Sequence, residues 1–141
     1  MMKFRFAVPI AVLALGGLLA GNALAQAWPT KPVKIINPFP PGGGTDVFAR
    51  PLAVKLTNSL GQSVLIENQA GAGGTVGATN AAKAPGDGYT WFMGAVHHTI
   101  AETLYTKLPY NLERDFVPVT VVAYVPNVVV VHPKHPFKNV G

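Results

Sequence analysis

Two similar stretches decide the fold of this chain: Val33-Lys-Ile-Ile-Asn-Pro-Phe-Pro-Pro-Gly-Gly-Gly-Thr-Asp46 and Ser63-Val-Leu-Ile-Glu-Asn-Gln-Ala-Gly-Ala-Gly-Gly-Thr75. In each, a short apolar run leads into a glycine-rich turn, and the turn opens into a stretch with helical character. A strand, a glycine turn and a helix in this order direct unpaired backbone N–H groups towards an anion. Two such turns predict two half-sites that face one crevice and receive a carboxylate or phosphate group.

Hydrophobic spacing along the rest of the chain predicts alternating strands and helices. We expect strands over 33–36, 64–67 and 89–93, helices over 47–60, 75–83 and 100–107, a loop over 94–99, and extended runs over 117–125 and 127–132. This alternation predicts an α/β fold with a mostly parallel sheet of four or five strands flanked by helices. Pro51 lies inside the first helix and lacks an N–H, which predicts a kink or regular pairing only after it.

The two stretches align without a gap at a spacing of thirty residues, so that Val33 matches Ser63 and the sequence 43–45 matches 73–75. Thirty residues is about the length of one βα unit. The alignment therefore predicts one unit used twice. Ligands of parallel sheets bind outside the carboxyl ends of the strands, where both glycine turns are predicted to lie.

The first 25 residues have the pattern of a secretory signal peptide. Lys3 and Arg5 precede an uncharged apolar run over 6–20, and Ala23-Leu24-Ala25 forms a small-residue cleavage site. We expect cleavage after Ala25 and a periplasmic location. A retained membrane anchor is the alternative, but the apolar run is shorter than the roughly 20 residues that span a bilayer.

Charge and composition exclude several classes of function. The chain has 11 Lys and Arg against 6 Asp and Glu, a net charge of +5, which becomes +3 without Lys3 and Arg5. The positive residues are scattered and do not form a nucleic-acid-binding stripe. Cysteine is absent, which excludes disulfides and thiolate metal sites. The glycines around 71–77 fit neither a Walker loop nor the dinucleotide fingerprint, and we expect no cofactor.

The predicted binding chemistry rests on backbone amides. Glycines at 42–44 and 73–74, with Thr45 and Thr75, can bring N–H groups close to a carboxylate because glycine has no Cβ. The alternative is that these glycines only permit tight turns. Asp46 has two interpretations as well: a first-turn acid that satisfies helix N–H groups, or an acceptor for a ligand amine, hydroxyl or bridging water.

His97 and His98 follow the third predicted strand, at the same edge of the sheet. Adjacent histidines tend to point apart, and no acidic cluster accompanies them, so we expect no metal site. Contact between a histidine and a ligand carboxylate is favoured over a metal site. The Thr99 hydroxyl is a further candidate donor. No nucleophile and no general base stand in a catalytic arrangement, so we do not expect an enzyme.

The quoted stretches resemble the solute-binding receptors of the tripartite tricarboxylate transporters, also called TctC or Bug proteins. The resemblance continues through 82–90, 108–119 and 126–133. It implies a periplasmic receptor of the Venus-flytrap type that captures a small organic acid (a di- or tricarboxylate, an aromatic acid or an amino acid) and passes it to a membrane permease. Such receptors have two lobes and roughly 300 residues; we expect 26–132 to be the N-terminal part of the first lobe and 133–141 the start of the crossover to a second.

The resemblance also implies which residues line the ligand site. They belong to the two turns and to the stretch after the third strand: Phe39, Gly42, Gly43, Gly44, Thr45, Asp46, Ala70, Gly71, Ala72, Gly73, Gly74, Thr75, His98 and Thr99. Two other functions remain as alternatives: a small exported enzyme that uses His97 or His98 with Asp46 on a carboxylate substrate, and a truncated chain that binds nothing and associates through an unpaired sheet edge.

Overall fold

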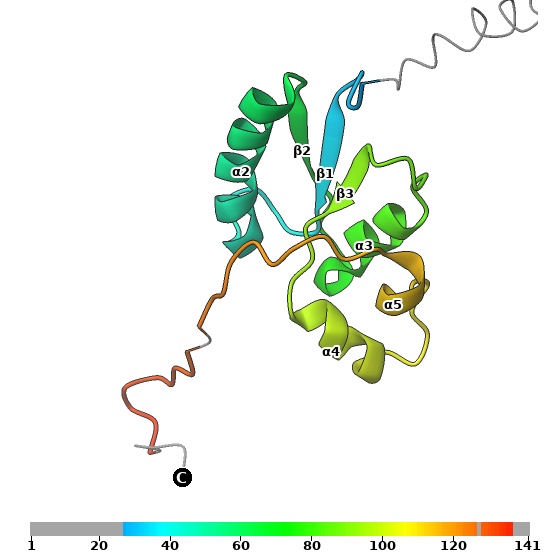
Figure 1. Cartoon of the computed structure of the whole chain (residues 1–141). Coiled ribbons are helices and arrows are strands. Elements are labelled where there is room, and N and C mark those ends of the chain that lie inside the picture. The colour runs from blue at the N-terminus through cyan, green and yellow to red at the C-terminus, as the bar shows by residue number, and fades with distance from the viewer. Residues whose placement is uncertain (1–26, 127, 137–141) are drawn as a thin grey trace, which may run out of the picture. The chain divides into compact units, whose positions relative to one another are not determined.

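The computed structural model describes residues 27–126 and 128–136 (Figure 1). The chain divides into two compact units, 1–30 and 31–141, and only 27–30 of the first unit are described. The predicted signal peptide, its cleavage site and the last residues of the predicted crossover lie outside the described residues. All elements below belong to the second unit.

Three strands form the parallel sheet: β1 (Val33–Asn37), β2 (Val64–Asn68) and β3 (Thr90–Phe92), in the order β2-β1-β3. Both neighbours run parallel to β1. The predicted α/β class is thereby confirmed. The predicted count of four or five strands is wrong for the described residues, because the valine-rich stretches at 117–126 and 128–132 form no strand there.

Helix α2 (Gly44–Leu60) covers one face of the sheet. The Gly43 carbonyl accepts from the N–H groups of Asp46 and Val47, so the helix begins three residues earlier than predicted. Gly61 ends it in the left-handed conformation at φ 67°, and its N–H donates to the Thr57 carbonyl. The helix continues through Pro51.

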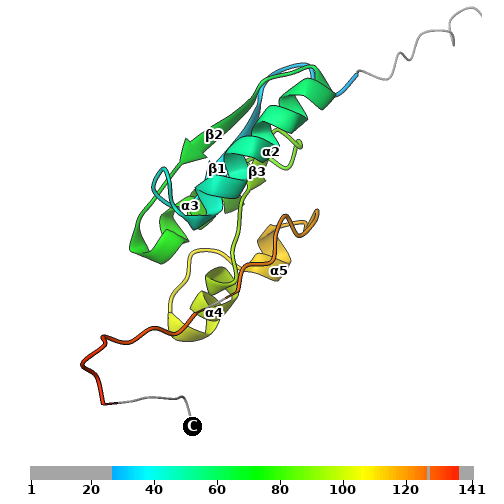
Figure 2. The same ribbon diagram turned by 90° about the vertical axis from the view of Figure 1, so that its left-hand side faces the viewer.

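The apolar core lies between α2 and the sheet. Val33, Ile35 and Val64 are buried on the strand side, and Ala49 and Ala53 bring α2 against them. Alternate residues of a strand face opposite sides, so Ile36 faces away from this core. The second face is covered by α3 (Thr75–Ala82), which contacts β1 and β3 and lies on the other side of the sheet from α2 (Figure 1). Figure 2 shows α2 in front of the strands.

Two short helices follow β3. Helix α4 spans His97–Leu104 and α5 spans Leu112–Asp115. The prediction of a loop at 94–99 is wrong in its second half, because α4 begins at His97 instead of at 100. The Asn111 side chain caps α5 by accepting from the N–H of Arg114 at 2.8 Å.

The two βα units repeat at a spacing of thirty-one residues, not thirty. Val33 pairs with Val64 and Asn37 pairs with Asn68, and α2 and α3 begin at Gly44 and Thr75. Both connections, 38–43 and 69–74, therefore have the same length. The predicted alignment placed the turns correctly, but its register was wrong by one residue.

After α5 the chain has no helix or strand over 116–126 and 128–136. Most of the large apolar side chains here are exposed, among them Val119, Val129 and Val130. In the described part of the chain, no helix has the length and apolar character needed to span a bilayer.

Candidate functional site

The two glycine turns lie at one edge of the sheet. Each follows the carboxyl end of its strand, and the last residues of the two strands, Asn37 and Asn68, pair directly. The pairing extends into the turns, because the Gln69 N–H donates to the Asn37 carbonyl at 2.8 Å. The predicted position of the turns is thus confirmed, whereas their ligand contacts stay predictions.

In the first turn, the amides divide into occupied and open donors. The Gly42 N–H donates to Asp46 Oδ2 at 2.8 Å, and the Gly43 N–H donates to the Pro40 carbonyl at 3.1 Å. The N–H groups of Gly44 and Thr45, at the start of α2, have no acceptor within 27–126 and 128–136. The Thr45 hydroxyl donates to Asn37 Oδ1 at 2.5 Å, so it is engaged within the protein.

The second turn runs through a series of positive φ angles. Gly71, Ala72, Gly73 and Gly74 have φ values of 143°, 45°, 63° and 89°, a region that costs an L-residue such as Ala72 about 1–2 kcal/mol. The Gly74 N–H donates to the Gly71 carbonyl at 2.8 Å. In the described chain no acceptor takes the N–H groups of the exposed residues 71–73. The Thr75 hydroxyl donates to the Ala72 carbonyl.

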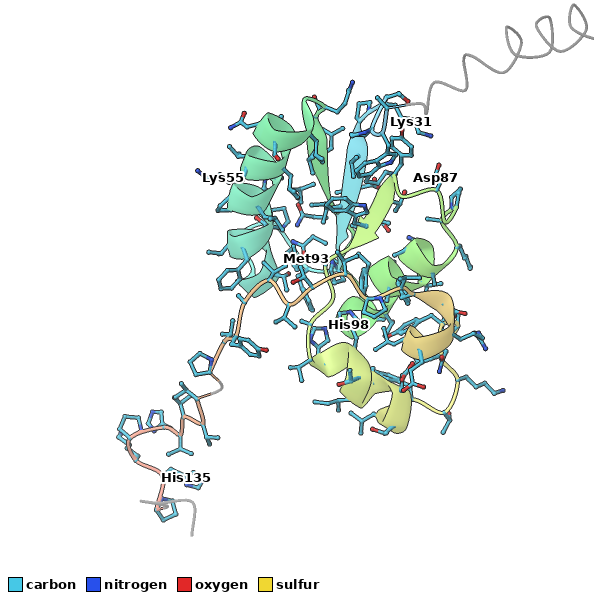
Figure 3. The ribbon with its side chains drawn as sticks, viewed as in Figure 1. Lys31, Lys55, Asp87, Met93, His98 and His135 are labelled. Carbon is cyan, nitrogen blue, oxygen red and sulfur yellow. The ribbon has the colours of Figure 1, made fainter. Side chains whose placement is uncertain are left out.

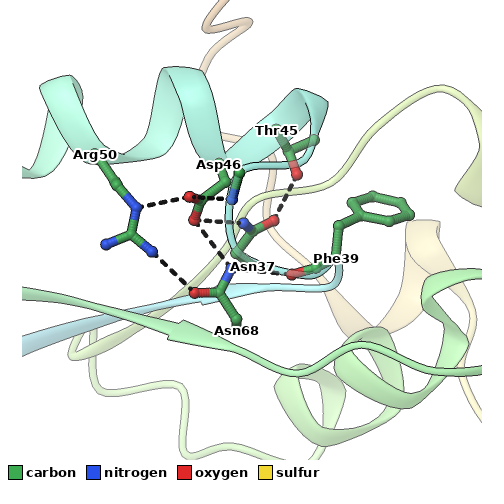
Figure 4. Close-up of polar contacts among 7 residues, drawn as sticks. Asn37, Phe39, Thr45, Asp46, Arg50 and Asn68 are labelled. Carbon is green, nitrogen blue, oxygen red and sulfur yellow. Dashed lines mark hydrogen bonds and ion pairs between the residues drawn. The ribbon is translucent and has the colours of Figure 1, made fainter.

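Asp46 is the centre of a polar network behind the first turn (Figure 4). Its Oδ2 accepts from the Gly42 N–H and, at 2.6 Å, from Arg50 Nε. Its Oδ1 accepts from Asn37 Nδ2 at 3.2 Å and from Asn68 Nδ2 at 3.0 Å. Hydrogen bonds from Arg50, then Gly42, then Asn68 hold the pKa of the Asp46 carboxyl well below its usual range. Asp46 is buried, and both of its oxygens are occupied.

His97 and His98 pack against each other, which corrects the expectation that they point apart. Their ring centroids are 4.1 Å apart, and Phe39 lies edge-on to His97 at 4.7 Å. A Cβ at Gly74 would lie 3.0 Å from His98 Nε2 and 3.3 Å from Phe39 Cζ. Rings from the first turn and from α4 therefore fill the space that a side chain at Gly74 would need. Figure 3 shows His98 on α4.

Both Nε2 atoms of this pair are buried and have no hydrogen-bond partner in the described chain. Burial lowers the pKa of His97 and His98, and for His97 the neighbouring His98 lowers the pKa further. Backbone groups of Ala95 and Gly74 oppose this effect at His98. Near neutral pH both rings are consequently uncharged.

Two further predicted site residues are Ala70 and Thr99. Ala70 is exposed in the second turn. Thr99 is exposed on α4, and its hydroxyl donates to the Val96 carbonyl at 2.6 Å.

The enzyme alternative needs Asp46 beside a histidine, but the four donors to Asp46 are Gly42, Arg50, Asn37 and Asn68. His98 Nδ1 contacts the backbone of Ala95 instead.

Sequence reasoning missed Asn37, Arg50 and Asn68. The i, i+4 spacing of Asp46 and Arg50 on a predicted helix was a usable signal for an ion pair. The two asparagines end equivalent strands, which was visible only with the correct spacing of thirty-one.

Among the described residues, a separate open groove lies between α2 and β2, lined in part by Val54, Thr57 and Leu65, away from the open amides of the turns.

The sequence matches the model of the tripartite tricarboxylate transporter family receptor, TctC, over residues 48–141. A fold of this kind, with glycine turns at the carboxyl ends of parallel strands, defines part of a periplasmic binding protein. The chain belongs to the TctC receptor family. Family membership indicates an extracytoplasmic location.

Curated relatives are considerably longer than this chain. It is 44% identical over 118 residues to protein BugT of Bordetella pertussis, a match that covers 82% of the chain and 36% of the relative. It is 38% identical over 134 residues to a UPF0065 protein from the tcbD-tcbE intergenic region of Pseudomonas sp. strain P51, covering 87% of the chain and 40% of that relative. The chain thus spans about two fifths of the length of these proteins.

Solved structures show the same partial likeness. MatC from Rhodopseudomonas palustris, solved with bound malate, superposes with a TM-score of 0.62 at 40% identity and covers 67% of this chain and 33% of its own. The R. palustris protein Rpa4515, solved with adipate, gives a TM-score of 0.52 at 36% identity, with 60% and 28% covered. Both neighbours hold small dicarboxylates.

Proposed function

We propose that this chain is the carboxylate-binding part of an extracytoplasmic solute receptor and performs no chemistry. Its cargo is a small organic acid, and one carboxylate of that acid is held between the two glycine turns. Lys3, Arg5 and the apolar run at 6–20 support export by a signal peptide. Membership in a transporter receptor family supports delivery to a membrane permease.

One observation carries this proposal: N–H groups of both turns that have no acceptor among the described residues lie at the same edge of one sheet. Gly44 and Thr45 present their donors at the N-terminus of α2, where the helix dipole favours an anion by about 0.3–1 kcal/mol. Residues 71–73 present theirs from the second turn. Each hydrogen bond to a charged group adds about 1.5–3 kcal/mol, so several donors suffice for specific binding.

The bound malate and adipate of the two neighbours support a dicarboxylate as the cargo of this chain. The packing of His98 beneath Gly74 supports the second turn from inside the protein. A direct contact between a ligand and His98 or Thr99 remains a prediction.

Gly44→Val tests the proposal directly. A Cβ at Gly44 would meet no atom within 4 Å, and Gly44 does not have a positive φ. The added side chain therefore blocks the approach to the open amides with little cost to the fold. Gly86→Val is the matched control, because Gly86 is equally open and lies after α3.

Malate and adipate should raise the melting temperature of the unaltered chain. At a ligand concentration of about 100 times the Kd, the stabilisation corresponds to about 2.7 kcal/mol. Gly44→Val should lose the shift, and Gly86→Val should keep it. The proposal is wrong if none of a panel of organic acids shifts the unaltered chain, or if Gly44→Val responds as the unaltered chain does.

A further inference from the structure

Asn68 connects the second glycine turn to the first through its side chain. It is the last residue of β2 and precedes the turn at 69–74. Its Nδ2 donates to the Phe39 carbonyl at 2.9 Å and to Asp46 Oδ1 at 3.0 Å, and its Oδ1 accepts from Arg50 Nη2 at 3.3 Å. Every one of these bonds crosses from the second βα unit to the first (Figure 4).

Only a primary amide satisfies this position. The two N–H bonds of Asn68 Nδ2 serve two acceptors, the Phe39 carbonyl and the Asp46 carboxylate, while its oxygen faces the guanidinium of Arg50. Asp46 remains ionised, because Arg50 and its other donors lower the pKa of its carboxyl. A second carboxylate at position 68 would therefore face an existing one and lack the two donors.

The acceptors of Asn68 lie in the first turn and at the start of α2, directly after it. Phe39 belongs to the connection 38–43, and Asp46 holds the Gly42 N–H at 2.8 Å. Apart from this side chain, the continued strand pairing from Gln69 N–H to the Asn37 carbonyl joins the start of the second turn to the end of β1. Asn68 thus acts at the place where the separation of the two sets of open amides is determined.

Resting on the proposed function, we propose that Asn68 is a positioning residue for ligand capture. It holds the two glycine turns at the separation at which the donors of both reach one carboxylate. It does so through Phe39 and Asp46, without contacting the ligand. Binding by two half-sites depends steeply on their mutual placement, as in any preorganised site.

Three variants test this role with malate as the probe, by calorimetric titration of the full chain. Asn68→Ala removes all three bonds. Asn68→Asp keeps the shape but opposes Asp46 with a like charge, which raises the pKa of the introduced carboxyl. Asn58→Asp is the control, because Asn58 is an exposed residue of α2 outside the network. The affinity of each variant is divided by that of the unaltered chain at the same pH.

Asn68→Ala should weaken malate binding at least tenfold at every pH. Asn68→Asp should weaken it strongly above neutral pH and regain part of the affinity towards about pH 5, because the protonated carboxyl again donates to Asp46. For Asn58→Asp, the ratio of its malate affinity to that of the unaltered chain should stay near one at every pH. Circular dichroism and the melting temperature of each ligand-free variant establish that it is folded.

Two results would overturn the positioning role while leaving the proposed function intact: unaltered malate affinity in folded Asn68→Ala, or an Asn68→Asp ratio that does not rise as the pH falls. If the unaltered chain binds neither malate nor any other acid of the panel, the proposed function fails, and the positioning role fails with it.

Discussion

At the scale of single residues, the site combines one buried anion with a pair of neutral rings whose Nε2 atoms are buried. Asp46 is ionised because four donors surround it, whereas His97 and His98 lose their charge because burial removes them from water. The carboxyl of Asp46 takes up its proton at a much lower pH than the two histidines do. Their contributions to stability can therefore be separated by pH.

The histidine pair predicts a loss of stability between about pH 7 and pH 5. Burial places the folded-state pKa of His97 and His98 below the ordinary value of 6.5. Just below pH 6.5 the unfolded chain thus binds more protons than the folded chain, and the free energy of unfolding falls as the pH decreases. The contribution of Asp46 has the opposite origin, a depressed acid pKa, and is lost only at much lower pH.

Urea unfolding at pH 7 and pH 5 measures this dependence. His98→Gln removes one of the two titrating rings. It should reduce the difference between the urea midpoints at pH 7 and pH 5. His132→Gln, at an exposed position after α5, should leave the difference as it is in the unaltered chain. An equally large difference in His98→Gln would contradict the assignment of this pH dependence to the pair.

At the scale of elements, the close approach of α3 to the end of β1 depends on one glycine. A Cβ at Gly77 would lie 2.9 Å from the Gln69 carbonyl oxygen and 2.9 Å from Pro38 Cα. Both are backbone atoms, so neither can move aside without shifting a glycine turn. Gly77 is also the residue of the second unit that stands where Asp46 stands in the first.

Gly77→Ala should consequently destabilise the fold by about 1–3 kcal/mol, the usual cost of overpacking. Helix propensity alone predicts the opposite sign, a gain of about 0.5–1 kcal/mol. Gly86→Ala, where a Cβ meets nothing within 4 Å, is the control and should change stability little. Denaturant melts of the three proteins decide the sign, and a more stable Gly77→Ala would show that α3 does not pack this closely.

The sequence predicts those elements that follow from local periodicity. β-branched runs and Gly61 were sufficient for β1, α2 and β2, and the turns followed from their glycines. The beginning of α4 was missed because no capping residue precedes it: Val96 has no side-chain cap. Contacts of His98 with Phe39 and Phe92 stabilise the first turn of helix α4. Contacts between residues that are distant in sequence cannot be inferred from a local pattern.

The polar network was missed for a related reason. Asn37 and Asn68 are thirty-one residues apart and meet only because β1 and β2 pair in that register. The Gly-rich turns were aligned at thirty, which placed Asn37 opposite Glu67 and hid the equivalence. Asp46 was recognised as a candidate, but the two asparagines that donate to its Oδ1 are brought together by strand pairing.

At the scale of the whole molecule, the stretch after α5 exposes several large apolar side chains. Val117, Val119, Val129 and Val130 have 87%, 88%, 79% and 83% of their surface exposed. Runs of exposed β-branched residues without charge associate with one another as strands. The sheet also has two unpaired edges, at β2 and β3, among the described residues.

We therefore expect the purified 141-residue chain to associate as its concentration rises. Val119→Lys combined with Val129→Lys should reduce association, because charges on an exposed strand oppose pairing. Val47→Lys, at an exposed valine of α2, is the control and should associate as the unaltered chain does. Light scattering over a range of concentrations measures the effect, and a monomer at all concentrations would contradict this expectation.

The asparagine–aspartate network and the open amides involve different groups of the same region, and this division has a practical consequence. Resting on the proposed function, we expect that the cargo preference can be redesigned without rebuilding the scaffold. Libraries that vary Ala70 and Thr99, two exposed residues of the predicted ligand site, while retaining Asn37, Asp46 and Asn68 should change the surroundings of a captured acid. Sensors for industrial acids could be selected from such libraries with the anchoring of the carboxylate left intact.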